Sequence, residues 1–222
     1  MQINAAVVAG ATGMIGRYLV NILLEDAFYD VIVTLTRRPL EIESPKVEQR
    51  LVDFDHLNAA DLAGVTHLFC CLGTTMNTAG SREAFRRVDY EYCERFARLG
   101  REAGATRLML VSSGGADPKA LSFYLKTKGQ TEEAVSGLGF EALHIFRPSV
   151  LMGRRDEERA VERFLAGAFR GFEFLMKGPL SKFRPMPAGV LSAAMAAAGE
   201  RGEAGTHVHY YQDIVRLAGF SR

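Results

Sequence analysis

Short apolar runs alternate with longer amphipathic stretches through the first two-thirds of the chain. Runs rich in β-branched residues predict strands at 3–9, 31–36, 47–52, 66–72, 107–112 and 140–146. Apolar residues that recur every three or four positions predict helices at 14–26, 81–103 and 119–137. The apolar stripe of the second helix consists of Phe85, Val88, Tyr92, Phe96, Leu99 and Ala103. Strands that alternate with helices and are apolar almost throughout favour a parallel sheet with helices on both faces.

The alternation weakens in the last third of the chain. The stretch 154–177 is amphipathic, a stretch rich in proline and glycine follows at 178–189, and a short strand near 206–210 could close the sheet. The amphipathic stretch is compatible with a lid over a substrate cleft, packing against the sheet edge, a partner surface or contact with a membrane surface. We expect one α/β domain with a doubly wound, mostly parallel sheet of six to seven strands. Its core is predicted at 1–150, with a small C-terminal elaboration at 151–222.

Composition narrows the class of protein further. Apolar residues make up 48% of the 222 residues, enough for a sizeable core, and the net charge of +1 favours neither nucleic acid nor an anionic membrane. Cys70, Cys71 and Cys93 lack the spacing of metal ligands, and the five histidines are scattered, so we expect no metal and a reducing compartment. Without a signal peptide or a stretch of ~18 apolar residues for a membrane span, the sequence indicates a cytoplasmic protein.

The first predicted strand runs directly into the glycine-rich stretch GATGMIG at residues 10–16, which opens a helix. A turn of this kind lets a diphosphate approach the backbone, and the helix N-terminus offers free N–H groups to an anion. The alternative is a tight turn with no ligand. The candidate dinucleotide contacts in this turn are Gly10, Thr12, Gly13, Met14, Ile15 and Gly16.

The second predicted strand ends in LTRRPL, where a site for NAD usually carries an acid for the ribose diol. Here Thr36, Arg37 and Arg38 stand in that place, and no carboxylate occurs before Glu41. Because a guanidinium forks onto phosphate and stacks on a purine, this end favours the 2′-phosphate of NADP. Two surface arginines in a loop are the alternative.

Asp53 and Phe54 follow the third predicted strand and are further candidates for the cofactor site. Asp53 is placed to accept from the adenine amino group. It is equally placed to cap the helical turn that follows, and the sequence does not separate the two uses.

The stretch FYLKTKGQTEE places Tyr124 and Lys128 four residues apart, on one side of the predicted helix. The phenol of tyrosine, with a reference pKa of ~10, becomes a useful acid or base when an ammonium group lies beside it. Ser112 and Ser113 end the fifth predicted strand, where a serine hydroxyl can hold a substrate oxygen. The alternative is a solvated helix face without chemistry.

The motifs GATGMIG, TRRPL, CCLGTT, VSSGGAD, YLKTK and IFRPSVL occur in this order between residue 3 and about residue 151. Together they resemble the atypical short-chain dehydrogenases/reductases, in particular the branch of Tat-interacting-protein-like oxidoreductases. The resemblance implies a Rossmann fold, bound NADP(H) and a catalytic triad of Ser113, Tyr124 and Lys128. Asp89 occupies the place of the asparagine that the family usually carries.

The same resemblance implies further cofactor contacts after the fourth and sixth strands. These are Leu72, Gly73, Thr74, Pro148, Ser149 and Val150, in addition to Ser112, Tyr124 and Lys128. The predicted function is an NADP(H)-dependent oxidoreductase that acts on a small carbonyl or alcohol substrate as a monomer or homodimer. The alternative is an NADP(H)-binding regulatory or redox-sensing protein without significant turnover. A sugar-nucleotide epimerase fits less well, because the chain after residue 150 is short.

Overall fold

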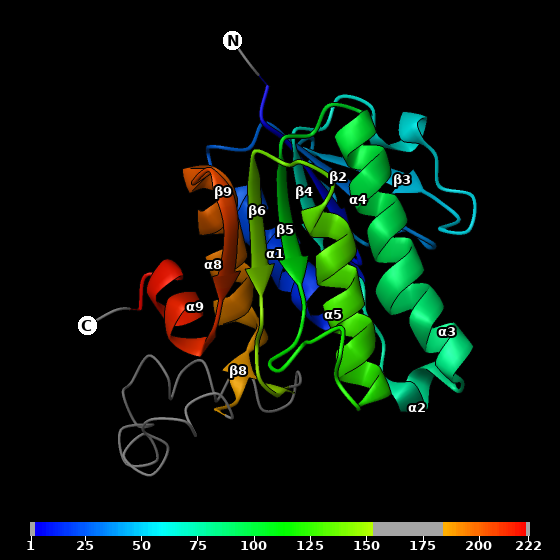
Figure 1. The fold of residues 1–222 in the computed structure, drawn as a ribbon. Coiled ribbons are helices and arrows are strands. Elements are labelled where there is room, and N and C mark those ends of the chain that lie inside the picture. The colour runs from blue at the N-terminus through cyan, green and yellow to red at the C-terminus, as the bar shows by residue number, and fades with distance from the viewer. Residues whose placement is uncertain (1–2, 153–183, 221–222) are drawn as a thin grey trace.

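Seven parallel strands form the central sheet in a computed structural model that describes residues 3–152 and 184–220 (Figure 1). Their spatial order is β3-β2-β1-β4-β5-β6-β9. The strands are β1 (Ala5–Ala9), β2 (Val31–Thr36), β3 (Val47–Leu51), β4 (His67–Cys70), β5 (Arg107–Val111), β6 (Ala142–Phe146) and β9 (Gly205–His209). The predicted doubly wound parallel sheet is confirmed, including the last strand at the edge. Two short strands, β7 (Leu151–Met152) and β8 (Met186–Pro187), pair with each other apart from it.

Helices cover both faces of the sheet (Figure 1). On one face lie α1 (Met14–Glu25), α8 (Ala188–Arg201) and α9 (Tyr211–Leu217). On the other face lie α4 (Tyr92–Glu102) and α5 (Phe123–Ser136), with the short helices α2 (Met76–Ala79) and α3 (Arg82–Arg86) before them and a 3-10 turn at Ala59–Leu62. The strand pleat divides β1 between two hydrophobic cores: Ala6 and Val8 pack towards α1 and α8, and Val7 and Ala9 pack towards α4.

The helix predicted over 81–103 is interrupted by a π-helical turn at Arg87–Glu91, between α3 and α4. A π turn holds more residues than an α turn. The next side chain to face the core therefore comes one residue later along the chain. Asp89 and Cys93 are therefore fully buried, whereas Val88 and Tyr92 are only half-buried. The predicted apolar stripe is wrong at Val88, because the hydrophobic pattern assumes an undisturbed helical period, whereas half-buried Tyr92 still packs against the core on this face.

The chain after residue 184 contributes to the main core. The Ser192 hydroxyl on α8 donates to the Ile15 carbonyl on α1 at 3.0 Å, and the Tyr29 hydroxyl donates to the Ala196 carbonyl at 3.4 Å. The amphipathic stretch 154–177 lies outside the described residues. Within residues 3–152 and 184–220, no helix combines the length and apolar character needed to cross a bilayer.

Three histidines stack where β9 joins β6. The ring of His144 on β6 lies 5.0 Å from the ring of His207 and 5.2 Å from that of His209, both on β9. A hydrogen bond of 2.9 Å joins His144 Nδ1 to His209 Nε2. Burial lowers the pKa of His144 to about 4, and the neighbouring His209, His207 and Arg107 act in the same direction. His144 is therefore neutral near pH 7.

Candidate functional site

The predicted site residues meet at one edge of the sheet because all strands run in the same direction. The strand order reverses between β1 and β4. On one side of this point β2 and β3 follow β1, and on the other side β5, β6 and β9 follow β4. Open α/β sheets bind ligands outside the carboxyl ends of the strands at such a reversal. The candidate residues follow the carboxyl ends of β1 through β6, so the topology gathers them around this crevice.

The glycine-rich turn after β1 has the backbone shape of an anion site. Gly10 has φ +85°, and a Cβ at this position would lie 2.6 Å from the Cys71 carbonyl oxygen. Gly13 N donates to Gly10 O at 2.9 Å, and Gly13 begins α1 without any side-chain cap. The first N–H groups of α1 are therefore available to a diphosphate. Ile15 and Gly16 are buried in the core, so they can offer only backbone groups to a ligand.

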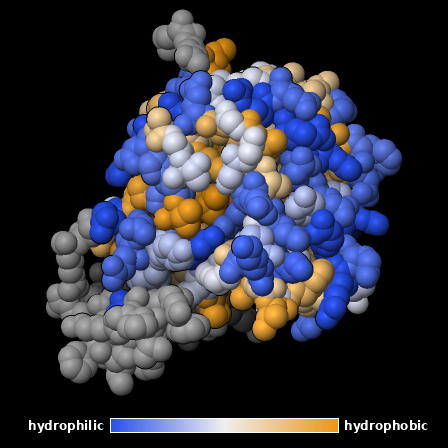
Figure 2. All heavy atoms as spheres, viewed as in Figure 1, coloured by the Kyte–Doolittle hydropathy of each residue, from blue (hydrophilic) through white to orange (hydrophobic). Residues whose placement is uncertain are grey.

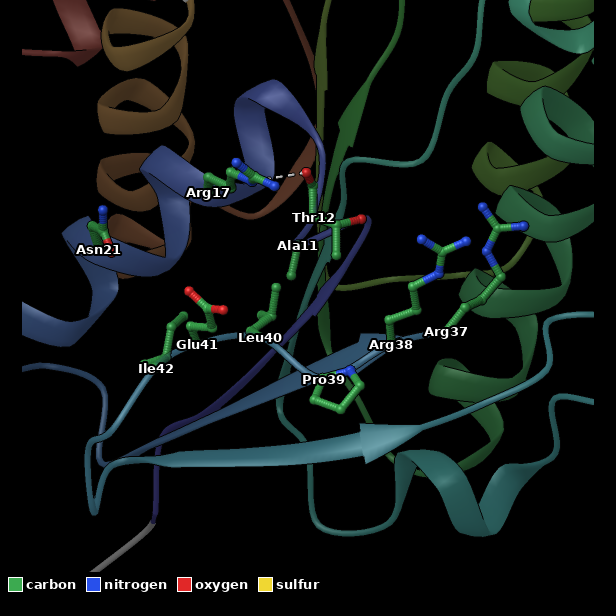
Figure 3. A pocket seen from close by; sticks show the side chains of 10 residues that line it. All are labelled: Ala11, Thr12, Arg17, Asn21, Arg37, Arg38, Pro39, Leu40, Glu41 and Ile42. Carbon is green, nitrogen blue, oxygen red and sulfur yellow. Dashed lines mark hydrogen bonds between the residues drawn. The ribbon is translucent and has the colours of Figure 1, made fainter.

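A pocket of about 750 Å³ lies beside this turn, between α1 and the end of β2. Its polar lining residues are Thr12, Arg17, Asn21, Arg37, Arg38 and Glu41. Figure 3 shows Arg37 and Arg38 on one side of Thr12, and Arg17, Asn21 and Glu41 on the other. Arg17 Nε donates to the Thr12 carbonyl at 3.0 Å, which fixes a third guanidinium at the pocket. Sequence reasoning missed Arg17, although a basic residue directly after the third glycine of the turn was a usable signal.

Residues at the ends of β2 and β3 lie at different depths. Thr36 is buried at the end of β2, and the Phe54 ring is also buried, stacked on Tyr92 at 5.6 Å. Asp53 is exposed and accepts hydrogen bonds from His56 Nδ1 at 2.7 Å and from Asp55 N at 3.0 Å. The bond from His56 lowers the pKa of the Asp53 carboxyl. Asp53 thus stabilises the turn formed by residues 53–56. Its carboxylate still faces solvent, where a ligand can reach it.

Helix α5 carries the predicted tyrosine and lysine. It begins after Ser122, whose hydroxyl accepts from Leu125 N at 3.5 Å. Tyr124 is half-buried, with its ring 5.5 Å from the Phe85 ring, and Lys128 is only 5% exposed one turn further on. Lys128 therefore does not belong to a solvated helix face.

The loop between β5 and α5 lies directly on the helix that follows it. A Cβ at Gly129 would lie 2.2 Å from the Asp117 carbonyl carbon, so only glycine permits this approach. Asp117 N donates to the Leu125 carbonyl at 3.2 Å. This packing holds the start of the loop, with half-buried Ser113, on the side of the sheet edge where α5 begins.

Lys128 pairs with a buried carboxylate beneath the loop that follows β4. Lys128 Nζ lies 2.7 Å from Asp89 Oδ1, and Asp89 Oδ2 accepts from Thr74 N at 2.8 Å. A Cβ at Gly73 would lie 3.7 Å from Lys128 Nζ, so the ammonium sits directly under this loop. Burial acts to lower the pKa of Lys128, but Asp89, with smaller contributions from Cys93 and Tyr124, raises it above the ordinary value.

Ser112 and Ser113 have separate surroundings. The Ser112 hydroxyl donates to the buried carboxylate of Glu132, which also accepts from Arg147 Nε at 3.0 Å. Arg147 Nη1 donates to the Tyr210 hydroxyl at 2.7 Å, and the hydrogen bond with Glu132 raises the pKa of Arg147. The Ser112 side chain thus belongs to a structural network that sequence reasoning missed, since its members come from distant parts of the chain.

The segment after β6 lies against the Ser113 loop. Gly114 N donates to the Pro148 carbonyl at 2.8 Å. The Ser149 hydroxyl donates to the Arg184 carbonyl, and Val150 is 68% exposed. The structure therefore places Pro148 next to the β5 loop, while the hydroxyl of Ser149 is engaged by the chain itself.

Comparison with known proteins identifies the family. A family model described as NAD(P)H-binding matches residues 10–166, which include the glycine-rich turn and α5. The chain belongs to this family. Protein HTATIP2 of Rattus norvegicus is 37% identical over 176 residues, covering 77% of this chain and 72% of the rat protein. The mitochondrial protein FMP52 of Lodderomyces elongisporus is 31% identical over 236 residues, covering 97% of this chain and 94% of the yeast protein.

Solved structures show the same fold at lower identity. A short-chain dehydrogenase/reductase superfamily protein from Agrobacterium tumefaciens with bound NAD is 17% identical, with a TM-score of 0.69, and covers 97% of this chain and 81% of its own. MoeE5 in complex with UDP-glucuronic acid and NAD is 20% identical, with a TM-score of 0.68 and the same coverage of each chain. Together with the seven-stranded parallel sheet, these likenesses show that this member of the NAD(P)H-binding family has a Rossmann fold.

The expectation of a cytoplasmic location is wrong. Relatives from Debaryomyces hansenii, Emericella nidulans and Lodderomyces elongisporus are named mitochondrial. The three cysteines are free, which fits any reducing compartment, so they do not distinguish the cytoplasm from the interior of an organelle. In the described part of the chain, no group of three or more histidine, cysteine or acidic residues could hold a metal ion.

Proposed function

We propose that the protein is an NADP(H)-dependent oxidoreductase that acts on a small carbonyl or alcohol substrate. The observation that carries the proposal is the buried position of Lys128 beneath Gly73, with Tyr124 one helical turn away and the Ser113 loop alongside. A structural lysine has no need of such a position at the carboxyl edge of the sheet, whereas a group that serves a nicotinamide ribose and a phenol does.

The chemistry of the residues present fits a dinucleotide that carries a 2′-phosphate. The uncapped N-terminus of α1 would hold the diphosphate, and Arg17, Arg37 and Arg38 would hold the 2′-phosphate in the adjoining pocket. Lys128 and the loop at Gly73 would hold the ribose next to the nicotinamide. When bound, NADPH supplies a hydride to the substrate.

The residues of this chain would then manage the proton and the substrate oxygen. The Ser113 hydroxyl donates a hydrogen bond to the carbonyl oxygen, which polarises the carbonyl and orients it towards Tyr124. The Tyr124 hydroxyl would give its proton to that oxygen, so that the substrate, with the hydride that NADPH supplies, would leave as an alcohol. The Lys128 ammonium stabilises the negative charge that this transfer leaves on the tyrosine.

The surroundings of Tyr124 suggest which substrates to test. Figure 2 shows a group of apolar side chains near the N-terminal ends of α5 and α2, separate from a second group on the β6/β9 side. Leu121, just before α5, is fully exposed, and Met76 on α2 is 37% exposed. Aldehydes and ketones with alkyl or aryl groups are therefore the first panel to offer together with NADPH.

The test is NADPH oxidation by the wild type and by Tyr124→Phe, which keeps the ring but removes the transferable proton. We expect kcat to fall about 10²–10⁴-fold, the usual contribution of general acid catalysis, while NADPH affinity stays within a few-fold. Tyr90→Phe is the matched control, since Tyr90 is half-buried on the π turn and packs under Arg86. Tight NADPH binding without turnover of any carbonyl would instead indicate a regulatory or redox-sensing protein.

A further inference from the structure

We propose that Asp89 is a positioning residue that keeps Lys128 charged and fixed beneath the cofactor loop. This inference deepens the proposed function, because it rests on the assignment of Lys128 to the nicotinamide side of the site. The buried Asp89 carboxylate thus acts on the charge of Lys128 next to Tyr124, in addition to stabilising the helix that carries it.

The two oxygens of Asp89 reach two different parts of the site. Oδ1 lies 2.7 Å from Lys128 Nζ on α5, and within the described residues it has no other polar partner. Oδ2 accepts from Thr74 N at 2.8 Å in the loop after β4. One carboxylate therefore ties the helix that carries the tyrosine to the loop that would line the cofactor.

The backbone around Asp89 is built to present this side chain inward. Asp89 lies on the π turn and is completely buried. Its carbonyl oxygen accepts from the Thr131 hydroxyl on α5 at 2.7 Å. This bond fixes the π turn to α5 independently of the carboxylate, which makes Thr131 a useful control.

The charge of Lys128 depends on this carboxylate. The titratable groups that act on Nζ are Asp89 on the π turn, Cys93 on α4 and Tyr124 on α5 itself. Burial is the strongest single influence and favours the neutral amine, so the ammonium persists because Asp89 opposes burial. If the carboxylate becomes a neutral group of the same shape, burial should prevail and Lys128 should lose its proton at a lower pH.

Asp89→Asn tests this dependence, because its amide oxygen can still accept from Thr74 N. Lysine side-chain signals are followed by NMR as the pH rises, and the Lys128 signal is assigned by its loss in Lys128→Met. We expect the Lys128 signal to titrate above the reference value of ~10.4 in the wild type and at least about one pH unit below that value in Asp89→Asn. NADPH affinity should then be nearly constant between about pH 7 and pH 9.5 in the wild type, and should fall at least about twofold over this range in the variant.

Thr131→Val is the matched control, since it removes a hydrogen bond at the same place but leaves the ion pair, and its Lys128 titration should match the wild type. An unchanged Lys128 titration in Asp89→Asn, or an equal loss of affinity at every pH, would overturn the proposal. If Asp89→Asn does not fold, the wild type still decides, because a Lys128 signal that titrates below about pH 9 contradicts a carboxylate-stabilised ammonium. The titration is independent of turnover, so failure of the proposed function shows separately, as absent carbonyl reduction.

Discussion

Three arginines line the pocket beside the glycine-rich turn, and their identity as arginines matters. A guanidinium offers paired N–H donors in one plane, which match two oxygens of a phosphate, whereas a lysine offers a single point of charge. Arg37 and Arg38 are exposed and have no acid directly beside them in sequence, and Glu41 lies towards Asn21 (Figure 3). We therefore expect the pocket to prefer an added phosphate over a ribose diol.

Replacement of Arg37 and Arg38 by alanine should weaken NADPH binding far more than NADH binding. A hydrogen bond to a charged group is worth ~1.5–3 kcal/mol, so we expect a loss of roughly 10- to 150-fold for NADPH. Isothermal titration calorimetry with both cofactors measures this difference. Arg216→Ala on α9 is the control, since its side chain is largely exposed and distant in sequence from the pocket. Equal affinity of the wild type for NADPH and NADH would contradict the assignment.

Gly13→Val tests the diphosphate site at the start of α1. A Cβ at Gly13 meets only the Gly10 carbonyl oxygen, at 3.1 Å, so the fold should survive the change. The branched side chain would occupy the space through which a diphosphate approaches the helix N-terminus. Dinucleotide affinity should therefore fall below detection in calorimetry while the circular dichroism spectrum is retained. Wild-type affinity in this variant would show that the cofactor binds elsewhere.

The elements differ in how well their sequences predict them. The strand predicted at 31–36 matches β2 (Val31–Thr36) because its β-branched residues are buried on both faces. The helix predicted at 81–103 failed at the π turn, since Asp89 is held inward by Lys128 and Thr74, which are distant in sequence. The hydrophobic pattern reports which faces are apolar and does not report a buried ion pair. Glu132 and Arg147 escaped sequence reasoning for the same reason.

Two buried histidines, His144 in the stack between β6 and β9 and His67 on β4, make the stability of the fold sensitive to acid. The pKa of His144 and that of His67 on β4 are each lowered to about 4, mainly by burial. The unfolded chain binds protons to these rings near pH 6.5, whereas the folded protein resists protonation until about pH 4. The stability they contribute is therefore complete above about pH 6.5 and is lost progressively as the pH falls towards 4.

Urea unfolding at pH 7.5 and pH 5 measures this loss. We expect each of the two histidines to lower the free energy of unfolding by on the order of 2 kcal/mol at pH 5. His144→Phe keeps an aromatic ring in the stack and should remove about half of the difference between the two pH values. His56→Phe is the control, because the His56 side chain is 84% exposed. A free energy of unfolding that is the same at both pH values would refute the effect.

At the scale of the whole molecule, cofactor binding and folding are linked, because α1, β4 and α5 all contribute to one crevice. A ligand that binds only the folded state at a concentration of 100 times its Kd adds ~2.7 kcal/mol to stability. For a domain of this size, that gain corresponds to a rise in Tm of about 5–10 °C. NADPH should raise Tm by this amount, NADH at the same concentration by clearly less, and Gly13→Val should abolish both shifts in a thermal melt. Equal shifts from both cofactors would argue against selection for the phosphate.

Insertion or deletion of one residue at the π turn changes which side chains face Lys128. An α-helix advances about 100° per residue, so one residue inserted into a helix leaves its two ends out of step unless the extra residue is absorbed in a wider turn. The turn at Arg87–Glu91 absorbs it, and Asp89 faces inward as a result. Deletion of one residue here would restore the α-helical period and bring the neighbouring apolar positions towards Lys128 instead. We therefore expect a relative with a one-residue gap in this turn to lack the ion pair between this lysine and this carboxylate.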